Sequence, residues 1–363
     1  MDILIKNNII KKNKIIVDVG DFAVKILDVR YAAKKININS AKVIDSSLFK
    51  RKEGYSFSEL AKRVDEETLG SGRKDISISL PNDFYDNKVV VIKNKKDSEI
   101  PKILKKDYYT FGRVSPITHV VDYAFLGKRE EQGDTVGYYL ISAIQKSTAS
   151  ELISAFAEHK LKITSIVSDV YNQVCLSELF FDEYEHLNRL FVDFGTDSIR
   201  ITAFAEGVAV YTRTVDIGFS SFENLLFESQ ETAGKSEIKA ALTQVGMVTD
   251  LLPGLYGDMF SLLDKDIYTD CLNKVSDNII SEIDRIIDLC SSNDISVTKL
   301  YMTGYVIKGL REKLQAHLGT DCEYLSLGNC YEKEGKTYSL SVNSENIDAE
   351  FTNALGMAVY PMI

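Results

Sequence analysis

Two aspartates in this sequence each end an apolar stretch and are followed two residues later by a glycine. Asp18 and Gly20 lie in the segment KIIVDVG, and Asp193 and Gly195 lie in RLFVDFG. An aspartate at the end of a buried strand, beside a glycine turn that lets backbone amides crowd together, can hold hydrated magnesium next to a phosphate. Two such hairpins could bind one nucleotide between them.

The two hairpins belong to a longer internal repeat. Each continues into a second apolar strand, at 24–26 and 199–201, and then into a third, at 36–44 and 207–215. Such a duplication predicts two lobes of like topology. The length of 363 residues also exceeds what one hydrophobic core ordinarily holds.

Between the repeats, the alternating strand at 75–80 stops at Pro81, which cannot donate to a sheet ladder. The pattern over 81–165 then changes to strand, polar helix, strand, strand, helix, with the last helix at 148–159. We interpret this range as a small inserted α+β subdomain. A strand at 163–167 and a helix at 169–179 lead into the second hairpin.

After the second repeat, helical patterning dominates from 222 to 290, and its last part carries apolar residues at three- and four-residue steps from Leu272 to Cys290. A strand at 297–302, a turn at Gly304, a helix at 308–318, a polar loop at 331–347 and a terminal helix at 353–359 complete the chain. We therefore predict four units. They are a first lobe (1–80, completed by 166–189 and 350–363), an inserted subdomain (81–165), a second lobe (190–215 and 295–349) and a helical subdomain (216–294).

The composition excludes several classes. A net charge of -10 argues against sequence-blind nucleic-acid binding. The five cysteines and four histidines are scattered, which favours reduced core thiols and gives no metal site made of protein ligands alone. No apolar stretch is long enough to span a bilayer. The lysine-rich stretch 88–106 fits a solvated hairpin face better than a patch for anionic lipid.

Taken together, these motifs resemble the actin-like ATPase superfamily. Its two phosphate loops correspond to 18–25 and 193–198, and its adenosine corner to 302–305. Within the superfamily the sequence is similar to the PilM family of type IV pilus assembly proteins, through the insertion after Leu80-Pro81, Arg213 before the turn at Gly218, and the terminal Ala-x-Gly-x-Ala motif at 354–358. The related cell-division protein FtsA shares the insertion, but it would be expected to end in a membrane-binding amphipathic helix.

The resemblance implies a two-lobed α/β fold of the duplicated ribonuclease H-like kind, with ATP and magnesium in the cleft. Asp18 and Asp193 would hold magnesium through water, Lys25 would add positive charge, and Lys239 would lie near the nucleoside. The implied nucleotide-binding residues are Asp18, Gly20, Asp21, Lys25, Asp193, Gly195, Thr196, Ser198, Lys239, Gly304 and Tyr305.

The sequence departs from that pattern at the site itself. Asp21, Phe22 and Ala23 replace the hydroxyl residues usual after the first glycine, Asp197 adds a second carboxylate, and Tyr305 replaces a glycine. Carboxylates repel phosphate unless a cation intervenes. We therefore expect weak or absent ATP binding and at most slow hydrolysis, and no residue is selected as a general base.

The resemblance further implies a cytoplasmic scaffold that reaches the inner face of the membrane only through a partner. A groove formed by 14–80 and 81–165 would receive the N-terminal tail of a PilN-like membrane protein, alongside other pilus assembly proteins. Self-association is left open. The alternatives are a sugar or acetate kinase of the same fold and a filament-forming protein like FtsA.

Overall fold

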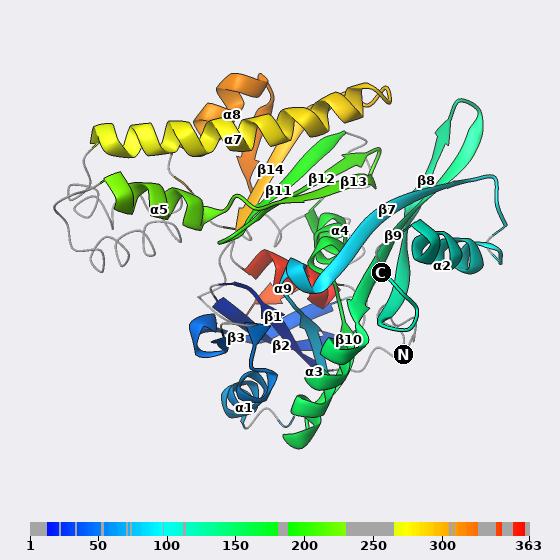
Figure 1. Cartoon of the computed structure of the whole chain (residues 1–363), viewed down its shortest axis with the longest axis vertical. Coiled ribbons are helices and arrows are strands. Elements are labelled where there is room, and N and C mark those ends of the chain that lie inside the picture. The colour runs from blue at the N-terminus through cyan, green and yellow to red at the C-terminus, as the bar shows by residue number, and fades with distance from the viewer. Residues whose placement is uncertain are drawn as a thin grey trace.

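The structure is a computed structural model of the chain. It describes residues 13–21, 23–32, 35–51, 54–69, 72, 75–96, 98–111, 114–180, 188–229, 265–304, 307, 309–325, 339–342 and 351–359. Two sheets lie one above the other with two helices between them, and a third, smaller sheet stands beside both (Figure 1).

The first lobe is built on a six-stranded sheet. In spatial order its strands are β10 (Lys162–Ile166), β6 (Asp75–Ser79), β1 (Asn13–Val19), β2 (Ala23–Ala32), β3 (Lys35–Asp45) and β16 (Ser339–Val342). Strand β1 is apolar on both faces because both faces are covered. Ile15 and Val17 face the helices α1 (Phe57–Glu67) and α3 (Lys146–Glu158), whereas Ile16 faces the layer between the lobes.

The second lobe repeats this plan with five strands. They are β13 (Val208–Val215), β12 (Ile199–Ala205), β11 (Arg189–Phe194), β14 (Lys299–Gly304) and β15 (Asp321–Tyr324). Its outer face is covered by α5 (Phe219–Ser229), α7 (Lys265–Ser291) and α8 (Leu310–Leu318). The apolar stripe predicted from Leu272 to Cys290 is confirmed, since its residues are buried along one side of α7.

The inserted sheet consists of β7 (Tyr85–Lys93), β9 (Asp134–Gln145) and β8 (His119–Glu131) in that order, with α2 (Ile100–Phe111) on one face. At its first-lobe end, the Tyr85 hydroxyl accepts a hydrogen bond from Leu80 N at 3.2 Å and donates one to Val167 O at 3.1 Å. At its far end, Gly127 lies against Val208 of β13, where a Cβ would stand 2.6 Å from Val208 Cγ2. The sheet therefore contacts both lobes.

The internal repeat predicted from the sequence is confirmed residue by residue. Asp18 pairs across the strands with Lys25, and Asp193 pairs in the same way with Arg200. Each hairpin closes through the glycine amide, which donates to Ala23 O at 3.0 Å in the first and to Ser198 O at 2.9 Å in the second. The two turns are thus equivalent in backbone geometry.

Helices α4 (Asp169–Phe180) and α9 (Thr352–Val359) form the layer between the sheets (Figure 1). Their buried residues join one core with side chains from both sheets, such as Leu27 of β2 and Phe191 of β11. The helices approach so closely that a Cβ on Gly356 would lie 2.0 Å from the carbonyl oxygen of Asn172. Gly356 is therefore fixed by packing, and the terminal helix holds the lobes together.

Two assignments differ from the sequence analysis. The polar loop expected at 331–347 contains β16, which pairs in parallel with β3 and so places 339–342 in the first sheet rather than the second lobe. Four residues of Ser-Leu-Ser-Val are too short a run to show strand periodicity. Helix α3, inside the range given to the insertion, packs on the first sheet. The remaining unit boundaries stay a prediction, and 230–264 lie outside the described residues.

Replacing Gly356 by alanine tests the α4–α9 contact. In an open helix this change would stabilise the protein by about 1 kcal/mol through helix propensity. Because the new methyl would collide with the Asn172 carbonyl, we expect instead a loss of about 1–3 kcal/mol in the free energy of unfolding, measured by urea denaturation. A gain in stability would show that the helices are not packed this closely.

Candidate functional site

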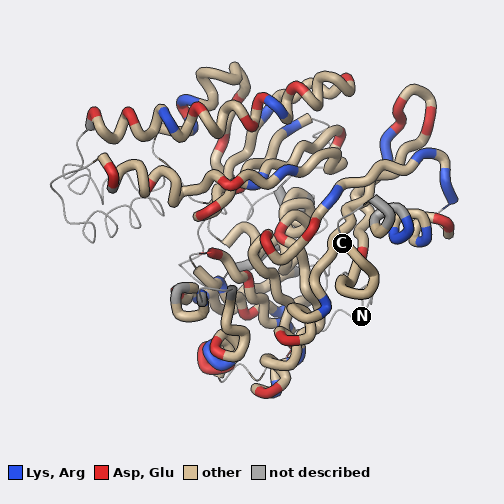
Figure 2. The backbone as a smooth tube through the Cα atoms, in the orientation of Figure 1, with Lys and Arg blue, Asp and Glu red and all other residues tan. Residues whose placement is uncertain are grey.

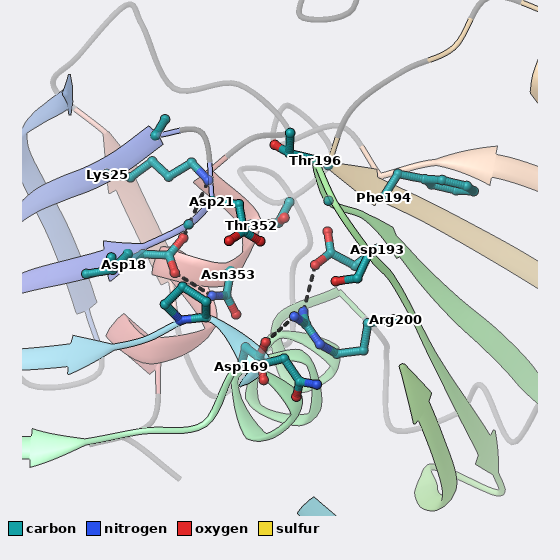
Figure 3. Close-up of a pocket in the computed structure, with 18 of the residues that line it drawn as sticks. Asp18, Asp21, Lys25, Asp169, Asp193, Phe194, Thr196, Arg200, Thr352 and Asn353 are labelled. Atoms are coloured by element: carbon teal, nitrogen blue, oxygen red, sulfur yellow. Dashed lines mark hydrogen bonds and ion pairs between the residues drawn. The ribbon is translucent and has the colours of Figure 1, made fainter. Parts of the chain in front are cut away.

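A small polar cavity lies where the two Asp-Gly turns face each other across the lobes (Figure 3). Its volume is about 80 Å³. It brings together nine of the residues predicted for the nucleotide site: Asp18, Gly20, Asp21, Lys25, Asp193, Gly195, Thr196, Ser198 and Gly304. The cleft between twin hairpins that the sequence predicts is therefore present, although the role of these residues as nucleotide ligands stays a prediction.

Asp18 is held by groups of its own lobe and of the terminal helix. Its side chain is buried, with Lys25 Nζ 3.7 Å from Oδ2, while Asn353 Nδ2 of α9 donates to Oδ1 at 2.6 Å. Burial raises the pKa of this carboxyl, and both Lys25 and the Asn353 hydrogen bond oppose that rise. The charge of Asp18 is thus compensated inside the protein.

Asp193, the equivalent residue of the second lobe, is also fully engaged. Thr303 Oγ1 donates to its Oδ1 at 3.0 Å, and Arg200 Nη1 donates to its Oδ2 at 2.8 Å. Both partners come from strands that flank β11 in the sheet. Every carboxylate oxygen of the two signature aspartates therefore already contacts a donor or a cation of the chain.

Arg200 also reaches out of its own lobe. Its Nη2 bonds Oδ2 of Asp169, the first residue of α4. Asp169 is fixed to the first sheet, because Val167 N, two residues earlier, donates to Ile78 O at 2.8 Å. Burial raises the pKa of Asp169 to about 6, although the Arg200 guanidinium acts in the opposite direction. Arg200 therefore links carboxylates of both lobes (Figure 3).

A second cation, Lys50, lies between the two turns. Lys50 Nζ of β4 (Lys50–Arg51) is 3.5 Å from Asp21 Oδ1 of the first turn and 3.5 Å from Asp197 Oδ2 of the second. Burial raises the pKa of Asp21, and Lys50 opposes this. The two acidic departures noted in the sequence are thus joined by one lysine.

Sequence reasoning missed Asp169, Asn353, Arg200 and Lys50 as parts of this site. Arg200 had a signal, because it occupies the place in the second hairpin that Lys25 has in the first. Asp169, Asn353 and Lys50 belong to elements far apart in the sequence, and no local sequence pattern links them. Gly304 is in the left-handed region, with φ +79°, and a Cβ there would lie 2.3 Å from Phe194 O. Lys239 and Tyr305 lie outside the described residues.

Other candidate sites remain separate from this cavity. Lysines at the end of β7 and along α2 are exposed, whereas Ile100 and Leu104 of the same helix are buried. Figure 2 shows basic residues along this part of the backbone. Exposure is common to a solvated face and to a patch for anionic lipid, so the interpretation of 88–106 stays a prediction. In the described part of the chain, no group of three or more His, Cys, Asp or Glu side chains is placed to hold a metal ion. None of the described helices is both long and apolar enough to cross a bilayer.

The duplicated sheets, the interlobe helices and the facing turns define an actin-like fold. No protein-family model matches the sequence, and no curated protein is significantly similar to it. Among solved structures the chain is similar to one described as the PilM-PilN type IV pilus biogenesis complex, with a TM-score of 0.73 and 15% identity over 96% of this chain and 98% of that chain.

A second solved structure, the ethanolamine utilization protein EutJ from Carboxydothermus hydrogenoformans, matches with a TM-score of 0.52 and 12% identity over 98% of this chain and 92% of that chain. At these identities the likeness establishes the fold. The predicted actin-like fold is thereby confirmed.

Magnesium and ATP, which the resemblance implies, do not fit the site in this arrangement. Pockets for small-molecule ligands usually hold about 300–1,000 Å³, whereas the cavity at the two turns, which does not include Lys239 and Tyr305, holds about 80 Å³. The carboxylates expected to hold hydrated magnesium instead contact Lys25, Asn353, Thr303 and Arg200. A nucleotide would first have to separate the turns and displace cations of the protein.

The pKa of Asp169 makes a prediction about stability. Its folded-state pKa of about 6 lies above the unfolded value of about 3.9, so the native state binds this proton more tightly. The resulting stabilisation is complete below pH about 4 and is lost as the pH rises through about 6. The free energy of unfolding of the wild type minus that of Asp169→Asn should therefore fall across this window by on the order of 2 kcal/mol.

Urea denaturation of both proteins at several pH values between 4 and 7 measures this difference. A difference that rises with pH would show that attraction to Arg200 outweighs burial and would contradict the prediction.

Proposed function

We propose that this protein is an actin-like scaffold of type IV pilus assembly that binds the N-terminal tail of a PilN-like membrane protein. The observation that carries the proposal is the similarity to the PilM-PilN complex over nearly the whole of both chains. That range includes the inserted sheet, so the likeness extends beyond the two lobes. In this proposal the chain acts at the cytoplasmic face of the membrane through its partner.

The groove for the tail would lie between the first lobe and the inserted sheet, within 14–80 and 81–165. The way the two are joined supports this placement. Tyr85 bonds Leu80 and Val167 at the start of β7, and Ser142 Oγ of β9 donates to Ser168 Oγ, which follows β10 in the chain, at 3.4 Å. The inserted sheet is therefore anchored to the first lobe at a defined angle, as a wall of a binding groove must be.

ATP would act at most as a modulator. The paired carboxylates and the small cavity allow at most weak nucleotide binding, and none of the described side chains that line the cavity is oriented as a general base. Asp169 has a raised pKa, but Arg200 bonds its Oδ2 and the Val170 amide donates to its Oδ1 at 2.8 Å. A carboxylate engaged at both oxygens is poorly placed to accept a substrate proton. This argues against the kinase alternative.

Calorimetry with a synthetic peptide of the PilN-like protein's N-terminal tail from the same genome tests the proposal. We expect one-to-one binding with a dissociation constant in the micromolar range, and no binding of a scrambled peptide of equal composition. Sugar- or acetate-dependent ATP consumption without peptide binding would contradict the scaffold proposal and favour the kinase alternative. Sedimentation of the protein as polymer on addition of ATP would favour the filament-forming alternative.

A further inference from the structure

Two cations of the chain bridge the lobes at the site where a magnesium nucleotide would join them. In the inner bridge, Arg200 of the second lobe contacts Asp193 of its own lobe and Asp169 beside the first sheet. In the outer bridge, Lys50 of the first lobe contacts Asp21 of its own lobe and Asp197 of the second. The arrangement is reciprocal, because each lobe sends one cation to a carboxylate of the other.

The inner bridge is buried and multiply bonded. The side chains of Arg200 and Asp169 are 10% and 4% exposed. A guanidinium presents its donors as a planar fork, which allows one arginine to bond two carboxylates at once. If the lobes separated, Asp169 would remain near the first sheet without its cation. The pair forms only when the lobes are closed, and the bonds of Arg200 to both Asp169 and Asp193 offset the cost of removing these charges from water.

The outer bridge contributes less stability, but it lies where it can hold the two turns together. Lys50 and Asp197 are 38% and 51% exposed, and such pairs contribute little stability by themselves. Their importance comes from position, since Lys50 joins the tips of the two turns that would otherwise hold a phosphate. The side chain of Lys50 would have to leave before a phosphate could lie between them.

We infer that resident cations, Arg200 and Lys50, close this cleft in the place of a magnesium nucleotide, so the closed form requires neither metal nor ATP. The inference follows from the disagreement between the implied cofactor and the donors present: the oxygens that magnesium would need are bonded to the protein's own cations and donors. Closure is then an intrinsic property of the fold. That partner binding is independent of nucleotide is a consequence that rests on the proposed function.

Electron spin resonance distances across the cleft test the inference. Ser58→Cys on α1 and Gln315→Cys on α8 are exposed positions on opposite lobes (Figure 1). The cysteines at 175, 271, 290 and 322 are buried, and Cys330 is replaced by serine throughout. We expect one narrow distance distribution in EDTA, unchanged when saturating magnesium and ATP are added.

The combined variant Lys50→Met with Asp169→Asn should broaden the distribution toward longer distances. Lys162→Met, which removes an exposed lysine at the start of β10, is the matched control and should leave it unchanged. Should the combined variant fail to fold by circular dichroism, the comparison of the wild type in EDTA with the wild type in magnesium and ATP decides by itself.

A wild-type distribution that is long in EDTA and shortens on addition of magnesium and ATP would overturn the inference. An equally narrow distribution in the folded combined variant would overturn it as well. Peptide binding is measured separately in EDTA. Closed lobes without peptide binding would contradict the proposed function but not the inference. Peptide binding by a wild type whose lobes are open in EDTA would support the proposed function and contradict the inference.

Discussion

Charge compensation inside the cleft is the constraint on which this structure depends. Three buried or nearly buried carboxylates, Asp18, Asp169 and Asp193, converge between two apolar sheets. A carboxylate removed from water is costly unless it is paired and hydrogen-bonded. In this chain Lys25 and Arg200 supply that compensation from the paired strands of each hairpin. The cleft can therefore remain closed while its acidic residues stay in place.

The same constraint explains why the Asp-x-Gly turns do not by themselves establish nucleotide binding. Their backbone geometry is set by strand pairing and by the glycine amide bonds at Ala23 O and Ser198 O. Those features form without any ligand. The chemistry of the turns depends instead on their side chains, and in this protein Asp21 and Asp197 face each other through Lys50. A preserved backbone can therefore accompany a changed electrostatic role.

Much of the fold could be predicted from the sequence because its signals are local. The hairpins repeat within short segments, the stripe of α7 follows helical spacing, and Pro81 marks the end of β6. The cavity was predicted at its two turns for the same reason. Asn353 and Asp169 could not be predicted as parts of the site, because they are 184 residues apart in the sequence. They reach the cavity only through the packing of α9 on α4. Strand β16 was missed because polar serines alternate over only four residues.

The inserted sheet has a mechanical consequence that follows from its two attachments. Tyr85 fastens one end to the first lobe, and Gly127 fits under Val208 of the second lobe at the other. The sheet thus connects the two lobes at separate points, in addition to the packed layer of α4 and α9. A rotation of one lobe against the other would separate Val208 from Gly127 or bend β8. Either change would move the inserted sheet relative to the first lobe. Movement of the lobes at the cleft is therefore coupled to movement of the inserted sheet at the surface of the molecule.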